Sequence, residues 1–271
     1  MFLRLLPALL AAAVIAAAAV LVAASADAGS AGKPRLPDLD QEAPSALAVV
    51  RAGRPEQPEY RLGFRSAVRN VGAGPLIIDG HRPDVGIDTM IADQVVVHRG
   101  GARRQVPGVG QLRYVVSPDH RHWHLLRFER YELRRPGGSK SLVGDEKTGF
   151  CLGDRYSVVG PRLPARAPDA VYEGQCGLGQ TELLGIREGI SVGYGDDYAG
   201  NLEGQYLPLT GLPDGRYVLV HRVNAHRRIH EASYRNNASS MLIRLRWRSG
   251  VPYVQTLERC AGSARCGATD G

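Results

Sequence analysis

The stretch YRLGFRSAVR, residues 60–69, decides the fold class of this chain. Apolar and basic residues alternate along it, with Tyr60, Leu62, Phe64 and Val68 on one side and Arg61, Arg65 and Arg69 on the other. A period of two is typical of a β-strand with one buried face and one solvated face. The stretch therefore predicts a strand whose apolar side chains enter a core.

Similar strand-like runs recur along the chain, at Leu76–Ile78, Val95–His98, Leu112–Val116, Trp123–Leu133, Arg216–Val223 and Met241–Trp247. Turns rich in Gly, Pro and Asp separate them, and the only candidate for a short helix is Thr181–Arg187. This pattern indicates an antiparallel sandwich or barrel. We predict an all-β fold, an antiparallel β-sandwich with long loops.

The N-terminal region divides into two parts. Leu5 to Ala26 is an uncharged run that ends in small residues, which predicts a secretory signal peptide over residues 1–26. Its length also suits an uncleaved membrane anchor, the one case in which we expect membrane contact. Five prolines indicate a flexible lead-in over residues 27–58, followed by one domain over residues 59–271. We expect an extracellular or cell-envelope protein.

The charge of the chain is strongly basic, with a formal net charge of +7 at pH 7. Basic surfaces attract phosphate-rich polymers. Arginine outnumbers lysine 31 to 3, however, a bias that codon usage also produces. We therefore expect a solvated cationic surface and no specific nucleic-acid partner.

Four cysteines suit two disulfides in an oxidising compartment. The close pair Cys260 and Cys266 is expected to clip the C-terminal tail, which leaves Cys151 to pair with Cys176. Neither pair has the Cys-x-x-Cys spacing typical of structural zinc sites.

Three of the eight histidines fall within six residues, in Asp119-His-Arg-His-Trp-His124. His120, His122 and His124 share one face if the segment is a strand. The outer two Cα atoms would lie about 13 Å apart in an ideal strand, so a common ion requires bending. We predict a site for copper, zinc or non-haem iron. A solvated histidine-rich strand is the alternative, and His122, His124 and Glu129 also match part of a cupin pattern.

The histidine triplet is followed by further motifs in a fixed order. They are Phe128, Tyr131 and Leu133, then the blocks at Lys147–Asp154, Glu188–Tyr198, Gln205–Thr210, Pro213–Tyr217 and Val223–Asn237. This ordered set spans most of residues 60–246 and resembles the lysyl oxidase family.

The resemblance implies a copper-dependent amine oxidase. His120, His122 and His124 match the copper-binding triplet, while Lys147 and Tyr198 match the two residues that form the lysine tyrosylquinone cofactor. Asp154 is carried over as a candidate base. The implied reaction consumes O₂ and a primary amine, such as lysine in a polypeptide, and yields an aldehyde, hydrogen peroxide and ammonia.

Two questions stay open at this stage. A secreted copper-binding or wall-associated module without catalysis would keep the same triplet. Moreover, a cationic protein needs a local acidic pocket to attract a cationic substrate. Asp196, Asp197 and Glu203 flank Tyr198 and would supply one, unless they form a solvated acidic turn.

Overall fold

A computed structural model describes residues 32–117, 120–146, 149–161, 163, 168–200 and 206–267. These residues form strands and no helix, and every strand pair among them is antiparallel. The prediction of an all-β fold is confirmed.

Two sheets flank a long central strand. The first, here called the β8 sheet, has the order β12 (Gly185–Ile190), β5 (Leu76–His81), β6 (Thr89–His98), β7 (Arg103–Ser117) and β8 (His120–Leu125), with β1 (Pro34–Arg35) paired to β6. The second, the β16 sheet, has the order β10 (Ser141–Glu146), β9 (Glu129–Arg134), β15 (Gly215–Val223), β16 (Ala238–Arg248) and β17 (Val251–Cys260).

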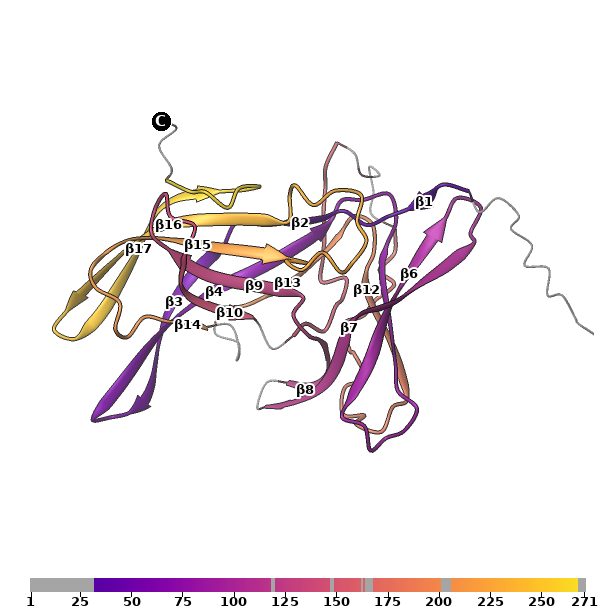
Figure 1. Cartoon of the computed structure of the whole chain (residues 1–271), viewed down its shortest axis with the longest axis horizontal. Helices are drawn as coiled ribbons and strands as arrows, with labels where there is room; N and C mark the ends of the chain where they lie inside the picture. The colour runs from indigo at the N-terminus through magenta and orange to yellow at the C-terminus, as the bar shows by residue number, and fades with distance from the viewer. Residues whose placement is uncertain are drawn as a thin grey trace, which may run out of the picture. The chain divides into compact units, whose positions relative to one another are not determined.

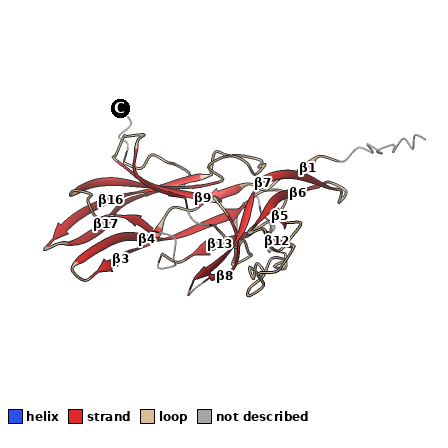
Figure 2. Ribbon diagram, turned by 60° about the horizontal axis from the view of Figure 1, so that its bottom comes forward, coloured by secondary structure: helices blue, strands red, loops and turns tan. Residues whose placement is uncertain are grey.

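The central strand is β4 (Gln57–Asn70). The sheet built on it, the β4 sheet, has the order β11 (Tyr156–Ser157), β13 (Tyr194–Tyr198), β4 and β14 (Tyr206–Pro208). β2 (Leu39–Gln41) and β3 (Ser45–Arg54) also pair with β4. The β16 sheet and the β8 sheet lie toward opposite ends of β4 (Figure 1; Figure 2).

β4 contributes to two hydrophobic cores. Leu62 and Phe64 pack with apolar residues of the β16 sheet. Val68 packs with residues of the β8 sheet, together with Tyr198 of β13. All three β4 side chains are fully buried. The β-sandwich therefore has β4 as the strand common to both of its packed regions.

The predicted strand runs are confirmed, with two local differences. Trp123–Leu133 is divided into β8 and β9 by a turn that contains Arg127 at φ 57°. The end of the candidate helix Thr181–Arg187 belongs to β12 instead, where Gly185 to Ile190 pair with β5.

The predicted lead-in over residues 27–58 needs correction. Pro34–Arg35, Leu39–Gln41 and Ser45–Arg54 are strands, and the proposed boundary at residue 59 falls inside the β3–β4 hairpin. Residues 31–271 group into one unit. Proline did not prevent pairing, because strands that add at a sheet edge tolerate it.

The proposed signal peptide, residues 1–26, lies outside the described residues. Among the described residues, no helix is long and apolar enough to span a bilayer.

Both predicted disulfides are confirmed. Cys151 is bonded to Cys176 with a Cα–Cα distance of 5.6 Å, and Cys260 is bonded to Cys266 with 5.4 Å. The first ties the segment after β10 to the loop before β12. The second fixes the tail against Val218, Val220 and Leu242 on the outer face of the β16 sheet.

Replacing Phe64 by Ala is expected to lower the free energy of unfolding by about 3 to 5 kcal/mol. Phe64 is fully buried, and its ring meets the edge of Tyr131 at a centroid distance of 4.9 Å. Chemical denaturation measures the loss. Val159→Ala, at a side chain that is 85% exposed, is the control and should change stability by less than about 0.5 kcal/mol. A similar effect of both variants would contradict the role of β4.

Glu231 predicts a pH dependence of stability. Its buried carboxylate accepts hydrogen bonds from Asn224 Nδ2 (2.6 Å), Asn237 Nδ2 (2.7 Å) and Leu39 N (2.7 Å). Burial raises the pKa of Glu231 from 4.5 to about 7, although these hydrogen bonds oppose the rise. The folded state therefore binds more protons than the unfolded state between these two pH values, so stability falls as pH rises through them.

Glu231→Gln should remove this contribution, on the order of 3 kcal/mol across the window. Denaturation midpoints of wild type and variant, followed from pH 4 to about 8, measure the difference in slope. Glu56→Gln, at an exposed carboxyl group, controls for the loss of one negative charge. Parallel curves for wild type and Glu231→Gln would rule out this source of pH dependence.

Candidate metal centre

The three histidines of β8 converge. Each offers one ring nitrogen, and these three atoms lie within 4.8 Å of one another. The ring centroids of His120 and His124 are 5.1 Å apart, and His122 lies 5.5 Å and 4.7 Å from them. The side chains therefore bring the three ring nitrogens close together, although the Cα spacing of a strand would keep the outer two residues apart. In the described part of the chain, this cluster contains the three histidines alone.

Bonds on both sides fix the backbone of β8. It pairs with β7, with His122 opposite Val115 and His124 opposite Arg113. On its other side, Trp123 N–H donates to Cys176 O (2.9 Å). Leu125 and Phe150 exchange backbone hydrogen bonds of 2.8 Å and 3.0 Å. The face that carries the three histidines therefore belongs to a strand that is held at both edges.

The first histidine also has an orienting neighbour. Ser117 Oγ lies 3.2 Å from His120 Nδ1, a hydrogen-bonding distance. Contacts of this kind fix the ring orientation of metal-ligating histidines.

Glu129, the carboxylate of the cupin alternative, lies elsewhere. Its Oε2 is 2.7 Å from His221 Nε2 and accepts hydrogen bonds from Ser66 Oγ (2.5 Å) and Tyr131 OH (2.8 Å). These buried groups join β9 to β15 and β4. Glu129 therefore serves a polar cluster inside the sandwich, and the cupin pattern is not completed at the histidines.

Lys147 and Thr148 lie outside the described residues, and the described part of the chain resumes at Gly149. A Cβ atom at Gly149 would lie 2.6 Å from His124 Cβ and 2.9 Å from Leu125 O, and Gly149 has φ 142°. The next residue, Phe150, places its ring 4.5 Å from the ring of Tyr198. Gly149 and Phe150 thus lie next to His124 and to the candidate cofactor tyrosine, respectively.

Tyr198 is 4% exposed and ends β13. Its hydroxyl group accepts a hydrogen bond from Cys151 N and donates one to Cys151 O, each 2.9 Å. Burial raises the pKa of the Tyr198 phenol well above its usual value, and the Asp196 carboxylate raises it further. The phenol is consequently held in its neutral form.

Two buried carboxyl groups influence Tyr198. Asp196 is fully buried, with Arg155 Nε 3.3 Å from its Oδ1 and Gly153 N donating to its Oδ2 at 3.3 Å. Glu188 is 1% exposed; burial raises its pKa well above 4.5, opposed by the backbone amide of Leu152. Asp196 therefore has a cationic partner, whereas the surroundings of Glu188 favour its protonated form.

Asp154, the base candidate from the resemblance, binds two loops together. Its carboxylate accepts hydrogen bonds from the backbone amides of Val171 (2.8 Å), Tyr172 (3.1 Å) and Ser191 (2.7 Å), and from Ser191 Oγ (2.7 Å). These bonds fit a role in loop positioning. Its action as a base stays a prediction.

The acidic pocket considered for a cationic substrate is not formed by the described residues of the turn. Asp196 is buried, and Asp197 Oδ2 accepts a hydrogen bond from Arg65 Nε at 2.8 Å. Glu203 lies outside the described residues.

Sequence reasoning missed Glu188 and Arg155. Glu188 had a signal, because Ile186 and Ile190 stand two positions on either side of it in β12, so a strand of period two turns all three to the core. Arg155 had none, since its partner Asp196 lies 41 positions away in the chain and only the fold joins them.

Comparison with known proteins points to the same family as the motifs. A family model described as lysyl oxidase matches residues 84–255, more than half of the chain. Lysyl oxidase homolog 4 of Homo sapiens is 30% identical over 132 residues, which cover 48% of this chain and 15% of that protein. Lysyl oxidase homolog 2 of Gallus gallus is 27% identical over 143 residues, covering 52% and 16%. The chain thus matches less than a fifth of the length of these curated relatives.

Replacing Gly149 by Ala is expected to weaken copper binding by about 10- to 100-fold, the range seen when a neighbour of a metal ligand is disturbed. The added Cβ would meet His124 Cβ and Leu125 O, and the backbone there has a positive φ that L side chains rarely adopt. Competition with a chromophoric chelator measures the affinity. Gly211→Ala is a matched control, because Gly211 also has a positive φ but no atom within 4 Å of an added Cβ. Wild-type affinity in Gly149→Ala would disprove the close approach.

Proposed function

Since this chain belongs to the lysyl oxidase family, we propose that it is a copper-dependent amine oxidase of the cell exterior. It would convert primary amines to aldehydes with O₂ and release hydrogen peroxide and ammonia. The observation that carries the proposal is the continuous contact from the histidine triplet through Gly149 and Phe150 to Tyr198. Two disulfides agree with an oxidising compartment.

The residues present fit copper. Three imidazole nitrogens within 4.8 Å of one another form a donor set that suits copper, and no thiolate competes because all four cysteines are in disulfides. His120, His122 and His124 would hold the ion. When bound, copper would promote the oxidation of Tyr198 by O₂. The cofactor formed by linking Tyr198 to Lys147 would then be the group that oxidises the amine.

The protein's own groups would control the position of Tyr198. Both hydrogen bonds of its hydroxyl group go to the backbone of Cys151, which lies four positions after Lys147. The Cys151–Cys176 bond anchors this backbone. Tyr198 is thereby kept beside the segment that begins at Gly149, and formation of the cofactor would require the Lys147 side chain to reach its ring.

Asp196 and Glu188, the two buried carboxyl groups near Tyr198, would take different parts in proton transfer: one would accept a proton and the other would donate one. Asp196 is stabilised as an anion by Arg155, while Glu188 is favoured in its neutral form by burial. A carboxylate beside a guanidinium group is suited to accept a proton, and a carboxyl group that burial keeps protonated is suited to donate one. We assign Asp196 as the acceptor of the phenol proton and Glu188 as a proton donor during cofactor formation, while Asp154 positions its two loops and stays the candidate base for the substrate amine.

The substrate class would be an exposed primary amine, including lysine in a polypeptide. Asp196 and Asp197 of β13 offer no open acidic surface to attract it, because the Asp196 carboxylate is buried and the Asp197 carboxylate is paired with Arg65. Selection would then depend on access to the site more than on long-range attraction.

Lys147→Ala and Tyr198→Phe should each abolish peroxide release and quinone staining of aerobically copper-loaded protein while copper binding persists. The reason is that each variant removes one of the two groups that must join. Peroxide is measured with a coupled peroxidase assay on a primary amine, and a peptide map of wild type should show residues 147 and 198 in one cross-linked species.

Lys140→Ala and Tyr253→Phe are the matched controls, because both side chains are exposed and lie outside the site. They should retain wild-type turnover. If wild type binds copper but remains colourless, shows no cross-link between residues 147 and 198 and releases no peroxide with amines, the non-catalytic copper-binding module is favoured instead.

A further inference from the structure

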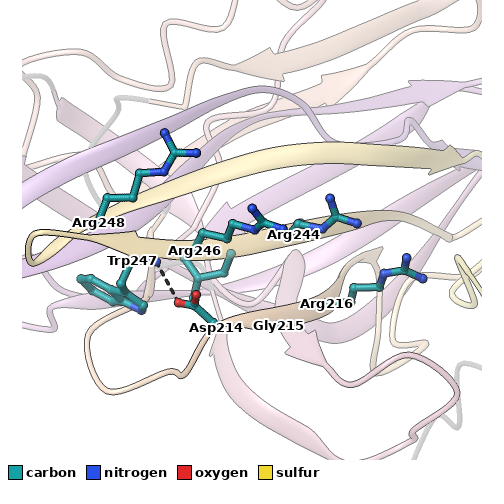
Figure 3. A pocket seen from close by; sticks show the side chains of 8 residues that line it. Asp214, Gly215, Arg216, Arg244, Arg246, Trp247 and Arg248 are labelled. Carbon is teal, nitrogen blue, oxygen red and sulfur yellow. Dashed lines mark hydrogen bonds between the residues drawn. The ribbon is translucent and has the colours of Figure 1, made fainter.

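A row of arginines occupies the outer face of the β16 sheet. Arg244, Arg246 and Arg248 stand at alternate positions of β16, so their side chains share one face. Arg216 of β15 is the Cα partner of Arg244 and extends the row across the sheet. Figure 3 shows the four guanidinium groups along these two strands, with the Trp247 ring on the other side of β16. We call these four residues the arginine face.

The arginine face lacks the carboxylate partners found elsewhere. On the same sheet, Arg134 and Arg222 both contact Glu132. In the described part of the chain, no ion pair involves any residue of the arginine face. Asp214 is the one acid that lines the adjoining depression, and its Oδ1 accepts a hydrogen bond from Trp247 N at 2.8 Å. Among the described residues, the face therefore carries an excess of positive charge, because four guanidinium groups stand beside one carboxylate.

The geometry suits an extended ligand. Alternate residues of a strand are about 6.8 Å apart, and paired residues of neighbouring strands are about 5 Å apart. A shallow depression of about 540 Å³ runs beside all four arginines. One small anion can reach the Arg216–Arg244 pair, whereas a linear polymer with repeated charges can contact the whole row.

The face is not built to stack nucleobases. Tyr253 is its exposed aromatic residue, and the Arg248 guanidinium already lies over that ring at 5.1 Å. The Trp247 ring packs against Tyr60 at 5.8 Å, on the core side. Proteins that bind single-stranded nucleic acid combine basic grooves with free aromatic platforms. A ligand here would be held through its charges.

We propose that the arginine face binds a linear polymer of phosphate groups. The guanidinium group presents a planar fork of N–H donors that matches phosphate oxygens in pairs, and it keeps its charge at every physiological pH. The bound polymer would anchor the protein by its β16 sheet. The histidine triplet, on the β8 sheet, takes no part in this contact.

The test compares the binding of long-chain sodium polyphosphate to wild type and to Arg216→Gln/Arg246→Gln. Both side chains are exposed, so the fold should tolerate the change, and thermal unfolding verifies this. At about 50 mM salt we expect at least a tenfold loss of affinity. The plot of log affinity against log salt concentration has a negative slope, and its magnitude should decrease by about 2, or about 1 for each phosphate contact removed. Arg216→Lys/Arg246→Lys, which keeps the charge but loses the fork, should lie between the two.

Arg103→Gln/Arg104→Gln is the matched control, since it removes the same charge from exposed positions on β7. It should change affinity less than twofold. An equal loss in both double glutamine variants would overturn the proposal, because net charge alone would then explain binding. So would displacement by inorganic phosphate at equal total phosphate, which indicates a single-anion site, or tighter binding of oligothymidylate, which indicates base contacts.

Discussion

The burial of one face of β4 is the constraint on which the rest of the structure depends. Leu62 and Phe64 enter the core beneath the β16 sheet, and Val68 enters the core beneath the β8 sheet. Between them, Ser66 is buried but polar. Because side chains of a strand alternate with a period of two, a shift of one residue would expose all four positions and turn arginines inward. The register of β4 thus fixes both halves of the sandwich together.

Ser66 lies between the β4 residues that enter the two cores, and its buried hydroxyl group is stabilised there by hydrogen bonding. Ser66 Oγ donates to Glu129 Oε2, which also accepts a hydrogen bond from Tyr131 OH and contacts His221 Nε2. These groups come from three strands: Ser66 from β4, Glu129 and Tyr131 from β9, and His221 from β15. An apolar contact would allow the β4 and β16 sheets to slide past each other, whereas these hydrogen bonds require one alignment, and polar networks of this kind specify a unique core. Since β13 pairs with Ala67 and Ser66 of β4, the same alignment places Tyr198.

The sequence predicted those strands in which apolar and polar residues alternate clearly. It did not predict strands without such an alternation or contacts between distant segments. The alternation in β4 and in β16, with Ile243 and Leu245 against Arg244 and Arg246, predicted two principal strands. β3 was missed because its burial is only partial along its length, so no apolar face stands out. The histidine triplet was found from spacing, but its convergence depends on side-chain rotamers and on edge bonds from residues 150 and 176. A local residue pattern thus predicts which side chains share a strand face, whereas contacts between segments far apart in the sequence can be known only from the structure.

The candidate site is divided between layers, and its assembly follows from that division. The histidines lie on β8 in the β8 sheet, and Tyr198 lies on β13 in the β4 sheet. Phe150 bridges them: it bonds to Leu125 through its backbone and fills the space beside Tyr198 with its ring. Gly149, directly before it, passes His124 at a distance that no larger residue permits. Phe150 and the adjacent Gly149 therefore fix how the segment from residue 149 onward passes between β8 and Tyr198, so that residues from three separate parts of the sequence meet at one place.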